Sequence, residues 1–286
     1  MNKFIEFLKL VRIEHSIMLV IAVLIAQIIV LGSFPSLDYN LYLSLIAPFF
    51  IGMAAFALND YLDIESDKIN KKLDRPLTKG VFSKEFVIIF CLTAYLIGII
   101  ASSFVDSWPI PFVIATGFAF LSLLYNYKLK DIALLGNIYI AFTMAIPFIY
   151  GNYIYSSELN FTILILFIVA FFVGLAREII KTIEDIEGDK KARKSDTLPM
   201  KIGIKKSIYL ASVFYILFIC LTPLPFIYGL NQYLPSLILV LVCDIGFIYL
   251  TIRLIKDDSQ KFLRKNRNIS LILLFIGLIA LLLAAI

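Results

Sequence analysis

Two clusters of acidic residues recur at one spacing in this chain, each directly after a long apolar run. The matched aspartates are Asp63, Asp67 and Asp74 in the first cluster and Asp185, Asp189 and Asp196 in the second. Carboxylates are costly near lipid, so two such sets at the ends of apolar segments indicate a functional site. Carboxylate oxygens in pairs are suitable ligands for Mg²⁺ held between a protein and a phosphate. The pattern therefore predicts a metal site for an ionised diphosphate.

The first cluster also has the spacing of one helical face. Asn59, Asp63 and Asp67 stand four residues apart, and Asp60 stands three residues before Asp63. If the preceding apolar helix continues through them, their oxygens form one stripe, and a divalent cation relieves the repulsion between the acids. A solvated acidic helix end is the alternative, but the second cluster favours metal binding. The predicted metal ligands are Asn59, Asp60, Asp63, Asp67, Asp185 and Asp189, and the predicted catalytic residues are Asp63, Asp67, Asp185 and Asp189.

Two cations share the register of the second cluster. Arg177, Lys181, Asp185 and Asp189 step by four residues at the end of an apolar run, so a continuous helix places them on one side. We predict that Arg177 and Lys181 hold phosphate oxygens while the carboxylates hold Mg²⁺. The alternative is snorkelling, in which long cationic side chains at helix ends reach out of the lipid to the interface.

Further candidates for substrate binding lie near other helix ends. Tyr125, Lys128 and Lys130 close the fourth apolar run, where the lysines could neutralise phosphate; on these residues alone, an aromatic belt with interfacial lysines is the better interpretation. Arg12 precedes the first apolar run, where it could anchor the interface or reach a second anionic substrate. Arg75 follows the first acidic cluster, and we predict that it binds substrate, as does Asn59 in addition to its role as a metal ligand.

The composition is that of a membrane protein. Hydrophobic residues make up 61% of the 286 residues, and the mean hydropathy is +0.93. A spanning helix needs about 20 mostly apolar residues. Nine segments qualify, at roughly 15–33, 41–60, 86–105, 108–127, 132–152, 160–180, 207–229, 234–253 and 268–286. We therefore predict an all-α membrane protein with nine transmembrane helices in a bundle, whose first span is an anchor and not a signal peptide.

The 26 Lys and Arg residues predict the orientation in the membrane. They lie only in residues 3–12, 68–84, 128–130, 177–206 and 253–267, and the alternate loops contain none. By the positive-inside rule, the N-terminus and both acidic clusters are cytoplasmic, and the C-terminus is outside. The net charge of +5 belongs to this one face, where it suits anionic lipid headgroups and phosphate substrates. It does not indicate nucleic acid binding.

The chain is predicted to be a single domain over residues 1–286. The recurring acidic cluster suggests two related halves, about 1–130 and 131–255, followed by a ninth helix, and internal repeats commonly place a binding site at their interface. The longest polar stretches, 61–85 and 185–206, each run from acids through basic residues to a Pro and a Gly. We expect these two loops to fold over the site as a cap.

Other classes of chemistry lack their motifs. No Walker A loop is present, which argues against ATP-driven transport, and neither HExxH nor GxSxG is present, so proteolysis and esterase chemistry have no support. Asp244 stands in the middle of the eighth apolar segment without a charged neighbour. An intramembrane acid is by default a functional candidate, and a neutral or side-chain-paired carboxyl is the equal alternative.

These features together resemble the intramembrane prenyltransferases of the UbiA family. The resemblance spans essentially the whole chain, although family members commonly have Asn where Asp74 stands. The resemblance implies a helical bundle with a central cavity, a lateral opening to lipid and dependence on Mg²⁺, with two ions expected when diphosphate is bound. The matching motifs are Asn59-Asp60-x-x-Asp63-x-x-x-Asp67, Asp74-Arg75-Pro76-Leu77 and Asp185-x-x-x-Asp189.

Within the family, residues 177–189 and 197–199 look most like the archaeal digeranylgeranylglyceryl phosphate synthases, although that subgroup usually has Asp where Thr182 stands. This resemblance implies transfer of a geranylgeranyl group from its diphosphate to the free glycerol hydroxyl of geranylgeranylglyceryl phosphate, in ether-lipid synthesis. The partners would be a prenyl diphosphate donor, a lipid-phosphate acceptor and membrane lipids. The extra phosphate of such an acceptor should need further cations, for which Arg12, Lys128 and Lys130 are available.

Three alternative functions remain open. The nearest is a family member that prenylates an aromatic ring, such as a quinone or haem precursor. A metal-dependent lipid diphosphatase would share the site but need no acceptor. A cation or phosphate transporter would use the acids as an ion path and should bury them at mid-membrane. In this chain the acids follow the spans, which favours the enzyme.

Overall fold

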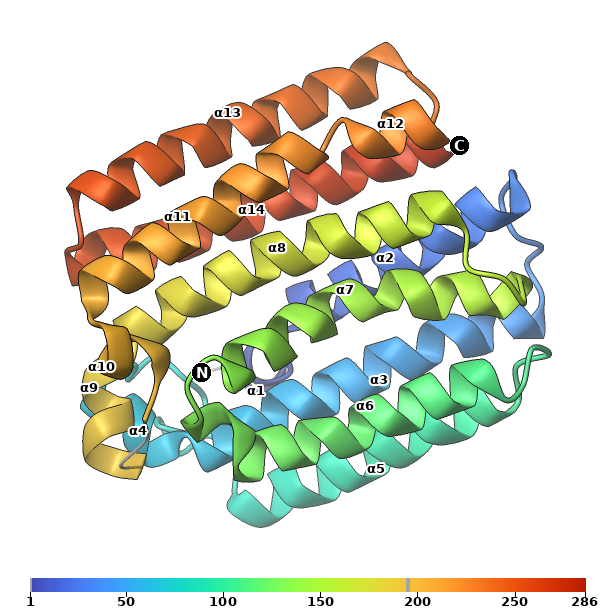
Figure 1. Ribbon diagram of the computed structural model, residues 1–286. Coiled ribbons are helices and arrows are strands. Elements are labelled where there is room, and N and C mark those ends of the chain that lie inside the picture. Colours follow the sequence, from blue (N-terminus) through green and yellow to red (C-terminus); the bar gives the residue numbers. More distant parts are fainter. Residues whose placement is uncertain (1, 194–195) are drawn as a thin grey trace.

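The computed structural model describes residues 2–193 and 196–286, and within these ranges it is helical, with a single isolated β-bridge between Ile132 and Asp196. Nine of the described helices are long and apolar enough to cross a membrane, which confirms the predicted fold class. They lie side by side in one bundle (Figure 1). These helices are α2 (Ile13–Leu31), α3 (Tyr39–Leu62), α5 (Lys84–Ser103), α6 (Ile110–Tyr127), α7 (Leu135–Tyr155), α8 (Phe161–Glu184), α11 (Ile204–Leu221) continued by α12 (Leu224–Tyr228), α13 (Leu234–Lys256) and α14 (Gln260–Ala285).

Shorter elements connect the spans. They are α1 (Lys3–Leu10), α4 (Ile64–Ile69), the 3₁₀ turn η1 (Leu129–Asp131), α9 (Ile186–Gly188), the π-helical turn η2 (Asp189–Arg193) and α10 (Leu198–Ile202). Figure 1 shows α4, α9 and α10 together at one end of the bundle, with the C-terminus at the other end. The two predicted cap loops therefore meet, although residues 194–195 of the second loop lie outside the described residues.

Local capping explains where two of the spans begin. Asp38 Oδ1 accepts a hydrogen bond from the amide of Leu41 at 3.0 Å, which satisfies a free donor in the first turn of α3. Ser259 caps α14 in the same way, because its Oγ accepts from the amide of Phe262 at 3.2 Å. The last span therefore begins at Gln260 and not at the predicted residue 268. Its first turns are basic, so the apolar run from which the span was predicted starts only after them.

Three large buried clusters hold the bundle together. The first joins α3, α5 and α6 with parts of α2 and α7, the second joins α8, α11, α13 and α14, and the third joins α2, α7 and α8. Gly151 of α7 lies so close to α2 that a Cβ there would be 2.5 Å from the carbonyl oxygen of Val23. Close approach at small residues is what draws helices together in lipid. On the outer face of α5, Ile89, Leu92 and Leu96 are exposed along one stripe, as expected for contact with lipid.

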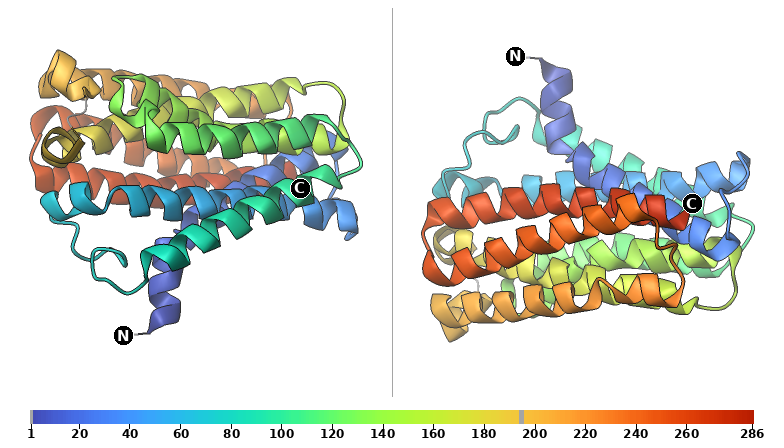
Figure 2. Two further views of the ribbon diagram at one scale, coloured as in Figure 1. Left: turned by 90° about the horizontal axis from the view of Figure 1, so that it is seen from below. Right: turned by 90° about the horizontal axis from the view of Figure 1, so that it is seen from above.

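The chain bends sharply between α1 and α2. Arg12 occupies the left-handed region there, with φ 45° and ψ 59°, a conformation that costs a non-glycine residue about 1–3 kcal/mol. α1 leaves the bundle at a steep angle to the spans (Figure 2). Lys79 Nζ lies 3.3 Å from both carboxylate oxygens of Glu6, which ties α1 to the loop before α5. The bend directs the Arg12 side chain to Asp60 on α3.

Candidate active site

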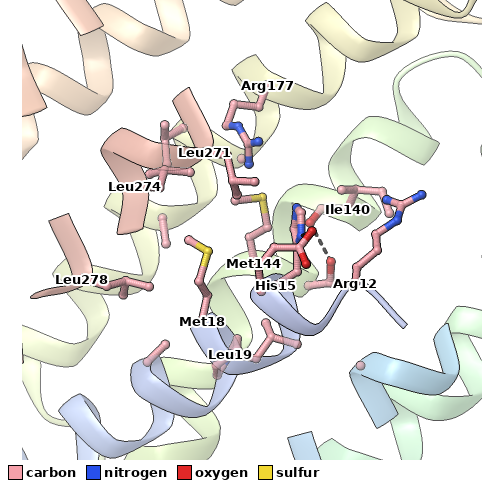
Figure 3. Close-up of a pocket in the computed structure, with 18 of the residues that line it drawn as sticks. Arg12, His15, Met18, Leu19, Ile140, Met144, Arg177, Leu271, Leu274 and Leu278 are labelled. Carbon is pink, nitrogen blue, oxygen red and sulfur yellow. Dashed lines mark hydrogen bonds and ion pairs between the residues drawn. The ribbon is translucent and has the colours of Figure 1, made fainter. Parts of the chain in front are cut away.

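A cavity of about 720 Å³ runs between the packed groups of helices, with lining residues from α2, α3, α6, α7, α8, α11, α13 and α14. Most of its lining is apolar, and Figure 3 shows Met18, Met144, Leu274 and Leu278 around it. Its charged lining residues include Arg12, Asp60, Asp74, Arg75, Arg177, Glu178, Lys181 and Arg267. A concave apolar site with a few polar groups suits a ligand that has a long apolar chain and a charged head.

A small polar pocket of about 40 Å³ adjoins this cavity. The aspartates of both motifs line it together, so the fold brings the four predicted catalytic carboxylates to one place. Arg75, Tyr125, Glu178 and Lys181 line the polar pocket and the large cavity alike, and they form the junction between the two. The pocket's aspartates are Asp63, Asp67, Asp185 and Asp189.

The two motifs have matching backbones. Asp63 is the C-cap residue of α3, with φ −97° and ψ 3°, and Asp185 is the C-cap residue of α8, with φ −92° and ψ 1°. Helical hydrogen bonding nevertheless continues through both ends, since the amide of Asp67 donates to the carbonyl of Asp63 at 2.8 Å, and that of Asp189 to Asp185 at 3.0 Å. The carboxylates therefore keep the four-residue register that the sequence indicates.

Two arginines neutralise the first motif. Asp60 Oδ1 accepts from Arg12 Nη2 at 2.7 Å and from Arg75 Nη1 at 2.8 Å. The same Arg75 nitrogen donates to Asp67 Oδ2. The Arg12 guanidinium also lies over the ring of Phe56, 5.3 Å from its centre. Asp60 is thus held by protein cations on both sides.

Two lysines occupy the space between the carboxylates. Lys130 Nζ lies 2.8 Å from Asp63 Oδ1, and Lys72 forms an ion pair with Asp185 while its Nζ lies 3.8 Å from Asp67 Oδ1. Both lysine side chains are 7% exposed. Lys72 therefore places a positive charge between an aspartate of the first motif and one of the second.

Hydrogen bonds of two uncharged side chains of the first loop hold the two loops together. Asn70 Oδ1 accepts from the amide of Gly188 at 2.8 Å, and Asn70 Nδ2 donates to the carbonyl of Asp185 at 3.3 Å. Ser66 Oγ donates to Asp189 Oδ1 at 3.2 Å. A Cβ at Gly188 would overlap the Asn70 side chain, so this contact requires glycine.

Burial and neighbouring charge shift the pKa values of these groups in different directions. Burial, with the adjacent Asp185 carboxylate, raises the pKa of Asp189 to about 6. Burial also acts on Asp185, but Lys72 and Lys181 outweigh it and hold the pKa of Asp185 below its usual value. Burial lowers the pKa of Lys130 to about 8. Asp185 therefore stays ionised at a pH where Asp189 takes up a proton.

The donor set suits a divalent metal, although it is not arranged as a metal site here. Among the residues that the structure describes, no three acidic, His or Cys side chains converge on a point that could hold an ion. Carboxylate oxygens from both motifs nevertheless line one pocket, and Lys72 supplies a cation between Asp67 and Asp185. Mg²⁺ prefers hard oxygen donors, and these carboxylates surround a position where the structure already places a positive charge.

Of three other predicted site residues, two lie at the pockets and one lies away from them. Asn59 Nδ2 donates to Asn126 Oδ1 at 3.0 Å and lines the large cavity. Tyr125 is buried and stacks on Tyr139 with ring centres 4.7 Å apart. Lys128 is exposed and lines neither the cavity nor the polar pocket. The structure therefore separates Lys128 from Lys130, which stands two residues later.

The two cations of α8 also differ. Lys181 Nζ pairs with Glu178 Oε1 at 2.9 Å and lines both the cavity and the polar pocket. Arg177 lines only the cavity, where its Nε donates to Ser270 Oγ at 2.9 Å and its Nη2 to the carbonyl of Arg267 at 3.3 Å. Arg177 and Lys181 thus lie on one face of α8 but have different partners, and only Lys181 lines both pockets.

Asp244 lines the same cavity and has a side-chain partner. Thr222 Oγ1 donates to Asp244 Oδ2 at 2.9 Å, whereas Asp244 Oδ1 is buried and accepts no hydrogen bond from the described residues. This agrees with the side-chain-paired alternative for Asp244.

Sequence reasoning missed three residues that connect the first polar loop to the second motif. Ser66, Asn70 and Lys72 stand in the first polar loop, and each contacts the second motif. Lys72 could have been suspected, because it belongs to the basic stretch next to the acids. Asn70 and Ser66 carry no comparable signal, since their partners lie more than a hundred residues away in the chain.

Comparison with known proteins identifies the family. Residues 19–279 match the UbiA prenyltransferase family. This chain belongs to that family. A digeranylgeranylglyceryl phosphate synthase of Archaeoglobus fulgidus is 35% identical over 94% of this chain and 92% of its own length. UbiA membership confirms the resemblance found in the sequence and makes this protein a prenyltransferase and a multi-pass membrane protein.

Solved structures of family members share the fold. A structure of digeranylgeranylglyceryl phosphate synthase superposes with a TM-score of 0.72, at 31% identity, and covers 100% of this chain and 99% of its own. A UbiA homologue from Archaeoglobus fulgidus bound to GPP and Mg²⁺ superposes with a TM-score of 0.63, at 18% identity, over 96% of this chain and 99% of its own. The second likeness concerns the fold alone.

Proposed function

We propose that this prenyltransferase moves a geranylgeranyl group from its diphosphate to the free glycerol hydroxyl of geranylgeranylglyceryl phosphate, with Mg²⁺ as cofactor. The observation that carries the proposal is the junction between the two pockets. Arg75, Tyr125 and Lys181 line both the apolar cavity and the carboxylate pocket. A prenyl chain in the cavity would therefore present its diphosphate to the two motifs. The synthase relatives support the choice of donor and acceptor.

The protein's own cations would bind the diphosphate. Lys72 and Lys130 pair with aspartates, and either ammonium can turn from a carboxylate to a phosphate oxygen as the local charge changes. Lys181 and Arg75 stand at the junction, where they can hold the same group. Bound Mg²⁺ would stabilise the charge of the leaving diphosphate. Two ions are expected, held by Asp63, Asp67, Asp185 and Asp189, with Asn59 and Asp60 as further candidate ligands.

The chemical step exchanges one C–O bond for another. The allylic C–O bond to diphosphate breaks, and the acceptor hydroxyl oxygen forms an ether bond to the same carbon. The hydroxyl proton passes to a diphosphate oxygen or to a carboxylate of the pocket. The apolar cavity keeps water from the allylic cation, and the buried Tyr125 ring at the junction can stabilise its positive charge.

The orientation of the protein in the membrane and its two related halves are proposals that rest mainly on the sequence. The cytoplasmic placement of the N-terminus and of both motifs rests on the distribution of Lys and Arg. The matched backbones at Asp63 and Asp185 support two related halves. Both motifs lie at one end of the bundle (Figure 1), which disfavours a transporter with acids at mid-membrane.

The test is product formation by the purified full-length protein. It is incubated with geranylgeranyl diphosphate, Mg²⁺ and one acceptor at a time, and products are identified by mass spectrometry. The proposal expects the diether from geranylgeranylglyceryl phosphate. Prenylation of a hydroxylated aromatic acid without ether formation would instead establish the aromatic alternative, and release of diphosphate without any acceptor would establish a phosphatase.

A further inference from the structure

Arg177 differs from the other cations of the site in having no carboxylate partner among the described residues. Arg12, Lys72, Arg75, Lys130 and Lys181 each form an ion pair with an acid. The hydrogen-bond partners of Arg177 are the hydroxyl of Ser270 and the main-chain carbonyl of Arg267. A partly buried cation without an ion-pair partner is costly, which suggests that its partner is an anionic ligand.

Two hydrogen bonds hold the guanidinium of Arg177 in place and use only some of its N–H donors. Arginine has five N–H donors in a planar fork. Nε and one Nη2 hydrogen are directed to Ser270 and Arg267, so the remaining donors are free to bind an anion. Figure 3 shows Arg177 pointing toward the cavity, on the side where His15 of α2 and Leu271 of α14 also lie.

An apolar path begins beside this cation. Leu271, Leu274 and Leu278 follow Ser270 along one face of α14 and line the cavity, opposite Met18 of α2 (Figure 3). A ligand bound here would have an anionic head at Arg177 and an apolar chain along α14. That is the chemistry of a lipid phosphate.

The carboxylate pocket is separate from this position. Lys181 lines both pockets, but Arg177 lines only the large cavity and contacts none of the four motif aspartates. A diphosphate bound through metal therefore belongs with Lys181, whereas the planar fork of Arg177 suits direct, bidentate hydrogen bonds to a phosphate monoester.

We propose that Arg177, held by Ser270, binds the phosphate of the lipid acceptor at the α2–α8–α14 side of the cavity and so selects acceptors that carry a phosphate monoester. This deepens the proposed function and rests on it for the identity of the acceptor. The sequence offered Arg12, Lys128 and Lys130 for this role. Lys128 is exposed and lines neither pocket, and the other two pair with Asp60 and Asp63.

The experiment measures equilibrium binding of two probes to the full-length protein in detergent, without turnover. One probe is geranylgeranylglyceryl phosphate, and the other is the same lipid without its phosphate. Wild type should bind the phosphate form at least about tenfold more tightly, and Arg177→Met should remove most of that preference. Arg177→Lys should restore part of it. Binding of a non-hydrolysable geranylgeranyl diphosphate analogue with Mg²⁺ should change less than about twofold in Arg177→Met.

The control is Arg264→Met, which removes an exposed arginine of α14 that pairs with Glu184 and lines neither pocket. It should keep the wild-type preference. The inference is overturned if wild type shows no preference for the phosphate, if Arg177→Met keeps it, or if Arg177→Met weakens donor binding equally. If the preference depends on Arg177 but no ether forms, the inference stands and the proposed reaction fails.

Discussion

Lys130 Nζ lies 2.8 Å from Asp63 Oδ1, so a lysine that follows α6 neutralises the aspartate directly after α3. Lys72 forms the corresponding ion pair with Asp185, the aspartate directly after α8. In both motifs a protein cation thus lies against a carboxylate that we propose as a metal ligand. Binding of metal and diphosphate would exchange these partners, with the metal taking the carboxylates and the lysines taking the phosphate.

The first prediction concerns the carboxylates. Asp63→Ala and Asp185→Ala should each lower kcat by at least about a hundredfold. Each removes a proposed ligand of the Mg²⁺ that would stabilise the negative charge of the leaving diphosphate. Steady-state turnover with geranylgeranyl diphosphate and Mg²⁺ measures this. Asp258→Ala is the control, since Asp258 is exposed and lines neither pocket. Near-normal activity in either site variant would refute the metal assignment.

Lys181 should act on the donor. Lys181→Met keeps the apolar stem but loses the charge at the junction of the two pockets, so the KM for geranylgeranyl diphosphate should rise about tenfold. Lys206→Met removes an exposed lysine of α11 as the matched control. Unchanged donor kinetics in Lys181→Met would favour snorkelling as the role of this side chain.

The contact between the loops should matter for activity more than for the bundle. Gly188→Ala forces the Asn70 side chain away and weakens its hydrogen bond to the Gly188 amide, so kcat/KM should fall about tenfold. Gly117→Ala is the control, because a Cβ there meets no atom within 4 Å. Thermal unfolding should change little in both. Equal activity of the two variants would show that loop contact is dispensable.

Mg²⁺ dependence should vary with pH through Asp189. The pKa of Asp189 is raised to about 6, so its carboxylate is protonated below that pH and loses its ability to bind metal. The Mg²⁺ concentration for half-maximal activity should therefore increase as pH falls from about 7 to about 5. Asp185 should not contribute, since its pKa is lowered. A flat Mg²⁺ requirement across this range would contradict the prediction.

The sequence alone determined the helices and the register of the motifs. Apolar length and capping are local, and a four-residue spacing puts Asp63 and Asp67 on one face whatever packs against them. The family motifs are likewise short and continuous, so the polar ends of α3 and α8 were recognisable as a site.

Only the tertiary structure decided which cations form ion pairs with which carboxylates. Lys128 and Lys130 are two residues apart, but the η1 turn after α6 leaves one exposed and buries the other against Asp63. Lys72 pairs with Asp185 directly after α8, and Arg177 donates to Ser270 of α14; both partners lie far away in the chain. Such pairings depend on how distant helices pack, and no local periodicity encodes that packing.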